Sequence, residues 1–321
     1  MSRDGIGSHT KRAARRLRLY RHKPDVWCDD KVGIDFSPYR SRAELEQFLK
    51  EHPGHHQWAR DQLQAGSLTL DPSRSPQREA LQAIARPGRY AFRWPNSGGK
   101  TVIGALAVLW FLDCYPDGAV VTTAGTWSQV KDQLWREIPY WADKAEDQLV
   151  FYVDDMDMTG VSVGHKWYAT ARAASKEATF EGVHSRRVLV VFDEGKAIPK
   201  GIYDAARRIL RGTDSTVWWI ALSTPGSPSG PFYKINQSPR WQVHHHSAYE
   251  TTRLDLSEIH ADAIELGEDS PLFTSMNLAQ FPRESENTII PLSELQSVVF
   301  GSEQAEKNLE RIYETDPPRR V

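Results

Sequence analysis

The chain has 321 residues, 40% hydrophobic and 26% charged, which is ordinary for a globular protein with ample core. Its net charge of −2 excludes an overall basic nucleic-acid-binding protein, so any DNA contact has to come from local patches. The two cysteines, Cys28 and Cys114, lie far apart and outside any metal-binding spacing, which favours a reducing cytoplasmic setting. The longest apolar stretch, 102–112, is about half of what a membrane-spanning helix requires.

The amino-terminal part divides into a basic arm and a helical segment, together residues 1–65. Residues 1–24 carry eight Lys or Arg against a single acid, Asp4. This composition favours a solvated arm, and the alternative is an electrostatic contact with DNA or an acidic partner. Residues 40–64 predict polar helices with a break at Pro53-Gly54.

Residues 66–250 show the alternation of an α/β core. Ser75 and Pro76 predict the start of a helix, and Val130, Leu134 and Ile138 form a helical stripe. Strand-like segments alternate with such helices, at 90–94, 119–124, 148–153, 161–171, 187–192 and 216–224. This order predicts a mostly parallel sheet with helices on both faces. Residues 251–321 are more polar and predict a small helical subdomain followed by a linker.

The segment "RWPNSGGKT", residues 93–101, has the composition of a phosphate-binding loop. Small residues allow backbone N–H groups to surround phosphates, a lysine reaches the β/γ oxygens, and a hydroxyl binds Mg²⁺. The segment also lies between a predicted strand and a predicted helix, whose N-terminus favours an anion. The strict pattern G-x-x-x-x-G-K-[ST] fails because Trp94 occupies its first position. A glycine-rich turn with a surface lysine is the alternative.

Two further strand ends carry candidate chemistry. The apolar strand in "RVLVVFDEGKAIP" ends in Asp193-Glu194, where α/β sheets bind ligands. One carboxylate there can hold Mg²⁺ while the next activates a water molecule, although paired acids also cap helices. The strand in "VWWIALSTPG" ends in Ser223-Thr224, hydroxyls that either sense the γ-phosphate or form a simple turn.

Several histidines and a short acidic segment are candidate metal ligands. His244, His245 and His246 are adjacent on a predicted strand, where neighbours point to opposite faces, so a structural role is favoured. His55-His56 lack a plausible set of partners in the sequence. The acidic segment "DMD", residues 155–157, predicts a polar hairpin.

Taken in order, these motifs resemble the ATPase half of phage terminase large subunits, the motors that package DNA into procapsids. The resemblance runs from about Gln77 to about Leu295. Besides the loop and the acids it includes "SPQREAL", "VVTTAGTWSQVKDQLWREI", "PSGPFYKI" and "PLFTSMNLAQFPRESENTIIPLSEL". It implies a P-loop ATPase of the ASCE type, with Walker A and Walker B motifs at the loop and the acids.

The resemblance also implies a role for each matching residue. Gln77 would contact adenine, and Arg93 would be a loop arginine acting near the γ-phosphate. Asp193 would organise Mg²⁺ together with Thr101, Glu194 would be the catalytic base, and Ser223-Thr224 would be the coupling motif. The nucleotide-binding loop would consist of Asn96, Ser97, Gly98, Gly99, Lys100 and Thr101. Trp94 and Pro95 depart from the family, in which small residues are common there, and Gly195 replaces a usual alanine.

The function so implied is ATP-driven translocation of double-stranded DNA into a procapsid, with ATP and Mg²⁺ as cofactors. Expected partners are the portal or procapsid, the small terminase subunit, and further copies of the chain in a ring in the host cytoplasm. In such a ring a neighbour supplies an arginine, for which Arg186, Arg187 and Arg208 are candidates. Family members usually continue into a nuclease domain, and we expect no nuclease activity from this chain. The alternatives are a helicase-like translocase and a nucleotide-binding docking or scaffold module without turnover.

Overall fold

In the computed structural model, the residues described are 18–145, 149, 159–164, 166–174, 183, 185–209 and 215–283. They form a seven-stranded sheet in the order β3-β4-β2-β5-β6-β1-β7. Its neighbouring strands are parallel except for the antiparallel pair β3 and β4. The strands are β1 (Gly88–Arg93), β2 (Gly118–Thr123), β3 (Gly160–Gly164), β4 (Trp167–Ala171), β5 (Arg187–Phe192), β6 (Thr216–Ser223) and β7 (Gln242–His245).

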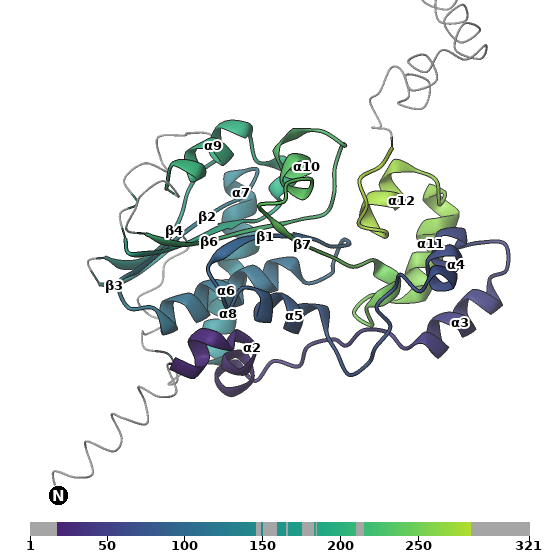
Figure 1. Ribbon diagram of the computed structural model, residues 1–321, viewed down its shortest axis with the longest axis horizontal. Helices are drawn as coiled ribbons and strands as arrows, with labels where there is room; N and C mark the ends of the chain where they lie inside the picture. The colour runs from purple at the N-terminus through teal and green to yellow at the C-terminus, as the bar shows by residue number, and fades with distance from the viewer. Residues whose placement is uncertain are drawn as a thin grey trace, which may run out of the picture.

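Helices cover both faces of this sheet, as the alternating pattern predicts (Figure 1). One face carries α2 (Pro24–Trp27), the π-helix η1 (Cys28–Val32), α5 (Pro76–Ala83), α6 (Lys100–Cys114) and α8 (Trp135–Lys144). The other face carries α9 (Lys200–Ile209) and α10 (Gly230–Asn236). Helix α6 is apolar on all sides because it is enclosed by the sheet and by α5 and α8. The mostly parallel sheet between helices is therefore confirmed.

Local signals placed several elements correctly, and two segments differ from the prediction. Ser75 caps α5 by accepting a hydrogen bond from the Arg78 N–H, and Pro76 is the first residue of that helix. The strand expected over 161–171 is instead the hairpin β3–β4, which reverses after Gly164. The helix expected after Thr126 is divided into α7 (Trp127–Gln129), the π-helix η2 (Val130–Leu134) and α8. Most of the strand expected at 148–153, and the acidic hairpin at 155–157, lie outside the described residues.

A second, smaller group of helices, here called the helical lobe, lies beside the sheet (Figure 1). It consists of α3 (Arg42–Glu51), α4 (Gln57–Ala65), the 3-10 turn η6 (Ala248–Glu250), α11 (Leu256–Leu266) and α12 (Pro271–Met276). These elements share one hydrophobic cluster that includes Leu45, Phe48, Tyr249, Ile259 and Phe273. The division at residues 65 and 250 stays a prediction, but the helices on either side of the central part pack together.

The buried Arg40 holds the two halves of the helical lobe together. Its guanidinium donates hydrogen bonds to the backbone carbonyls of Tyr249, Thr251 and Leu254. Strand β7 pairs with β1 in parallel and leads directly into this lobe, so the lobe lies beside the carboxyl end of β1 (Figure 1). Within the described part of the chain, no helix combines the length and apolar character needed to cross a membrane.

Candidate nucleotide-binding site

The loop between β1 and α6 has the backbone shape of an anion-binding turn. Strand β1 ends at Arg93, and α6 begins at Lys100 with Gly99 as its N-cap. Gly99 has φ = 89°, a left-handed conformation that glycine adopts without steric cost. Ser97 is also left-handed at φ = 55°, so the chain curls immediately before the N-terminus of a long helix. The predicted strand–loop–helix context of residues 94–101 is therefore present.

Lys100 is buried inside this loop. Its side chain is 6% exposed, and its Nζ donates a hydrogen bond to the carbonyl of Pro95 at 2.7 Å. Burial lowers the pKa of Lys100 to about 8, while the nearby carboxylates of Glu194 and Asp193 act in the opposite direction. The ammonium group therefore lies close to both predicted acids.

Asp193 offers a buried oxygen ligand beside this ammonium. The residue is fully buried, and burial together with the charge of Glu194 raises its pKa to about 6, opposed by Lys100 and the Thr101 hydroxyl. Its Oδ1 accepts a hydrogen bond from the Glu194 N–H at 3.1 Å. Its Oδ2 is buried without a hydrogen-bond partner among the described residues. A carboxylate oxygen and a hydroxyl are ligands that Mg²⁺ prefers, so the two predicted metal residues fit this ion.

Glu194 follows in a strained backbone conformation. It has φ = 49° and is half-buried, and a non-glycine residue there costs on the order of 1–3 kcal/mol. The next residue, Gly195, lies against Phe232 and Tyr203, and a Cβ there would come within 3.0 Å of the Phe232 ring and of the Tyr203 hydroxyl. Tyr203 also donates a hydrogen bond to the Gly195 carbonyl at 3.0 Å. This close packing accounts for glycine where the resembling family has alanine.

Strand β6 lies between β1 and β5, so its end, Ser223-Thr224, stands between the loop and the acids. Both hydroxyls contact Lys196, two residues beyond Glu194. The Lys196 backbone N–H donates to Ser223 Oγ at 3.2 Å, and its Nζ donates to Thr224 Oγ1 at 2.6 Å. Sequence reasoning missed Lys196, because nothing in the order of residues shows that β6 pairs with β5.

Three contacts from outside the loop hold three consecutive loop residues. The Asn96 N–H donates to the carbonyl of Met276 at 2.8 Å. Arg253 Nε donates to the carbonyl of Ser97 at 2.9 Å, and Gln77 Nε2 donates to the carbonyl of Gly98 at 3.2 Å. Gln77 therefore lies at the loop, and its adenine contact stays a prediction. Arg253 was missed, since no local signal connects it to the loop.

Arg93 and Trp94 have different surroundings from the rest of the loop. Trp94 is buried in the core, with its ring 4.6 Å from that of His246, so it is a packing residue. The Arg93 guanidinium lies 5.4 Å from the centroid of the Phe281 ring, and burial lowers its pKa. Its Nε has no hydrogen-bond partner in the described part of the chain. A role of Arg93 at the γ-phosphate stays a prediction.

The three arginines that are candidates for action on a neighbouring subunit lie away from this site. Arg186 and Arg187 are at the start of β5, whereas Asp193 follows its end. Arg187 contacts the carbonyl of Pro116 and lies 5.8 Å over the Tyr115 ring. Arg208 lies in the last turn of α9 and is exposed.

The histidines at 244–246 do not converge on one point. His244 stacks on Phe92 with ring centroids 5.1 Å apart, and His245 Nε2 lies 2.9 Å from the carbonyl of Leu278. His246 packs on Trp94. No group of three or more His, Cys, Asp or Glu side chains within the described ranges has the arrangement of a metal site.

His55 and His56 have hydrogen-bond and ion-pair partners in the helical lobe, although they do not belong to a metal-binding group among the described residues. His56 Nδ1 lies 2.7 Å from the Tyr249 hydroxyl, and its Nε2 lies 3.0 Å from His260 Nδ1. His55 Nδ1 lies 3.3 Å from Glu268 Oε1. These partners come from η6, α11 and the turn after α11, so far along the chain that no local pattern points to them.

The fold has counterparts among solved structures. A point variant of the Thermus phage P74-26 large terminase ATPase domain matches with a TM-score of 0.50 and 15% identity, covering 67% of this chain and 96% of that one. The large terminase of another thermophilic bacteriophage gives a TM-score of 0.49 and 12% identity, covering 65% of this chain and 53% of that one. The HK97 bacteriophage large terminase gives 0.49 and 15%, covering 72% of this chain and 54% of that one.

No family profile and no curated protein sequence matches the chain. The matched region spans about half the length of the latter two terminases. The P74-26 comparison covers nearly the whole of that ATPase domain and about two thirds of this chain. This comparison shows that the chain has the fold of that large terminase ATPase domain.

Proposed function

We propose that this chain is the ATP-hydrolysing motor domain of a viral large terminase subunit, which drives double-stranded DNA into a procapsid. One observation carries the proposal. The buried ammonium of Lys100 lies in a loop at a helix N-terminus, beside the buried Asp193, whose Oδ2 has no partner within the described ranges. A phosphate–Mg²⁺ group placed there satisfies both charges at once.

The residues present support a hydrolytic division of labour. The loop N–H groups of residues 97–101 and the Lys100 ammonium bind the phosphates. Mg²⁺, held by Thr101 and Asp193, would neutralise charge that develops on the transferred phosphoryl group. Glu194 takes the proton from the attacking water, and its strained backbone is typical of a residue at a functional site.

Two sets of contacts support coupling of hydrolysis to movement. Lys196 connects the segment after Glu194 to Ser223 and Thr224 by hydrogen bonds, so loss of the γ-phosphate can be transmitted to β6. Arg253 and Met276 bond the helical lobe directly to the phosphate loop. Through these hydrogen bonds a change of nucleotide would alter the position of the lobe, as a translocating motor requires.

The proposed partners follow from this function. They are double-stranded DNA, a portal or procapsid, a small terminase subunit, and identical chains in a ring. Arg186 and Arg187 lie at the opposite end of β5 from Asp193 and Glu194, and Arg208 lies in the last turn of α9, so each remains a candidate for action on a neighbour's phosphate.

A steady-state phosphate-release assay tests the proposal, with Mg·ATP alone, with duplex DNA, and with procapsids. We expect turnover that rises with DNA or procapsids and disappears in Glu194→Gln. Lys50→Gln, a change on an exposed face of α3, is the control that should behave as wild type. ATP binding without turnover in all three conditions would instead identify a docking module, and strand separation would identify a helicase.

A further inference from the structure

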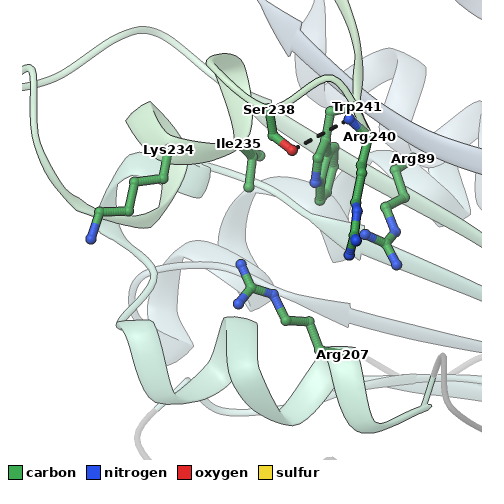
Figure 2. A pocket seen from close by; sticks show the side chains of 7 residues that line it. All are labelled: Arg89, Arg207, Lys234, Ile235, Ser238, Arg240 and Trp241. Atoms are coloured by element: carbon green, nitrogen blue, oxygen red, sulfur yellow. Dashed lines mark hydrogen bonds between the residues drawn. The ribbon is translucent and has the colours of Figure 1, made fainter.

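A cavity of about 570 Å³ lies at the amino end of β1, away from the nucleotide site. Figure 2 shows its lining, which consists of Arg89, Arg207, Lys234, Ile235, Ser238, Arg240 and Trp241. Four of these residues are cationic, and in the described part of the chain no carboxylate is among the lining residues. They come from β1, α9, α10 and the turn before β7, so the tertiary structure gathers them.

The cavity is separate from the loop that holds Lys100. Arg89 is the second residue of β1, and the loop begins after Arg93 at the other end of that strand. Arg89 and Arg93 are four positions apart on an extended strand, so their Cα atoms are roughly 13 Å apart. A ligand in the cavity would therefore not touch the loop that holds Lys100.

Three of the four cations in this cavity lie close to one another. Figure 2 shows the Arg89, Arg240 and Arg207 guanidinium groups pointing into the same space, with Lys234 at the edge. Besides burial, the charges of Arg240 and Arg207 lower the pKa of Arg89. The salt bridges among the described residues include none to Arg89, Lys234 or Arg240, and Arg207 pairs with Asp204 of its own helix at 3.3 Å. Such a concentration of like charge is stabilised by a bound anion.

The remaining lining residues indicate which anion fits. Ser238 contributes a hydroxyl to the lining, and its Oγ already accepts a hydrogen bond from the Arg240 N–H at 3.3 Å. Trp241 and Ile235 are buried and apolar. The cavity thus offers forked guanidinium donors, which match the geometry of phosphate oxygens. Arg207, Lys234 and Arg240 are exposed, so a macromolecule can reach them.

We propose that the cavity lined by Arg89, Arg207, Lys234 and Arg240 binds backbone phosphates of double-stranded DNA without regard to sequence. This assignment rests on the proposed motor function, because it names the DNA contact that such a motor needs. The net charge of −2 makes a local patch of this kind necessary.

Fluorescence anisotropy of a labelled mixed-sequence duplex, titrated with the full chain, tests the assignment. Lys234→Gln/Arg240→Gln should weaken binding roughly tenfold and flatten the dependence of log K on log salt by about 2. The control Lys50→Gln/Arg136→Gln removes the same charge from exposed positions elsewhere and should bind as wild type. Arg89→Gln provides a second variant, and circular dichroism checks that each variant is folded.

Three results of these measurements would contradict the assignment of the cavity to DNA. Equal loss in the cavity and control variants, or no loss in either, would overturn the assignment. A second ATP-binding event that survives Lys100→Ala but is lost in the cavity variant would also overturn it, since the cavity would then hold free nucleotide. ATP turnover without DNA is measured in parallel. A wild-type chain that lacks turnover would contradict the motor function but leave the DNA measurement valid.

Discussion

Arg253, in the turn before α11 of the helical lobe, donates a hydrogen bond from Nε to the backbone carbonyl of Ser97 in the loop between β1 and α6, at 2.9 Å. The same side chain lies 3.4 Å from the position that a Cβ on Gly99 would occupy. Arg253 is exposed and lies two residues after Thr251. The Thr251 carbonyl accepts a hydrogen bond from the buried Arg40, which anchors this segment to the lobe. The lobe therefore places a positive charge beside Ser97 and Gly99, next to the proposed position of the nucleotide phosphates.

Replacing Arg253 with alanine should weaken ATP binding. The change removes a loop hydrogen bond worth about 1 kcal/mol and a nearby positive charge, so we expect the Kd to rise roughly fivefold or more. Fluorescence of a labelled ATP analogue measures this. Arg42→Ala, which removes an exposed arginine from the same lobe, is the matched control. An unchanged Kd in Arg253→Ala would show that the contact has no part in nucleotide binding.

Replacing Glu194 with glutamine should separate binding from chemistry. The amide keeps the size of the side chain but cannot accept the proton of the attacking water, so turnover should fall by about two orders of magnitude or more. ATP affinity should stay close to wild type. Single-turnover hydrolysis together with equilibrium binding measures both quantities, and hydrolysis at the wild-type rate would remove Glu194 as the base.

Changes at Lys100 and Thr101 should have distinguishable effects. Lys100→Ala removes the buried ammonium from the loop, so ATP affinity and turnover should both fall. Thr101→Ala removes a predicted metal ligand and should raise the Mg²⁺ concentration required for half-maximal turnover. Mg²⁺ titrations of both variants make the comparison. ATP binding that survives Lys100→Ala unchanged would mean that residues 96–101 do not bind phosphate.

Asp193→Asn should stabilise the nucleotide-free protein while removing its response to Mg²⁺. Burial raises the folded-state pKa of Asp193 to about 6, so the ionised form costs stability, and this cost builds up as pH rises from about 4 to about 6. An uncharged amide avoids that cost, and we expect a higher Tm for the variant at neutral pH. Below a pH of about 4 the two proteins should converge, because the carboxyl is then neutral in both states. Thermal unfolding at several pH values, with and without Mg·ATP, tests this, and a lower Tm for the variant at neutral pH would contradict it.

The histidine cluster of the helical lobe should make stability fall in mild acid. Burial lowers the pKa of His56 to about 4, whereas an unfolded histidine titrates near 6.5. The folded state then binds fewer protons between these values, so its stability is complete above about pH 6.5 and lost as pH falls toward 4. The charged groups that act on His56 are Glu268, which opposes this shift, and His260, His52 and His55, which add to it.

Urea unfolding across this pH range measures the effect. His56→Gln keeps a hydrogen-bonding side chain at the site but does not titrate, so its free energy of unfolding should depend less steeply on pH. His22→Gln, at an exposed amino-terminal position away from the cluster, should leave the slope unchanged. Equal slopes in wild type and His56→Gln would show that the cluster does not control acid stability.

Local chemistry made much of the fold and part of the candidate site predictable. A cap such as Ser75, the apolar strand before Asp193, and the glycines before Lys100 each act over a few residues, so their spacing alone indicates the element they form. The parallel sheet follows from the alternation of such elements, because each crossover helix returns the chain to the same edge.

The order of the strands and the meeting of distant segments depended on long-range packing. Lys196 reaches Thr224 because β5 and β6 are neighbours, and Arg253 reaches Ser97 from 156 residues away. His56 and His260 meet across 204 residues because one hydrophobic cluster joins α4 to α11. The packing of apolar surface brings together segments that lie far apart in the sequence, and no local signal marks these meetings. Only the folded chain therefore determines which residues surround the loop between β1 and α6.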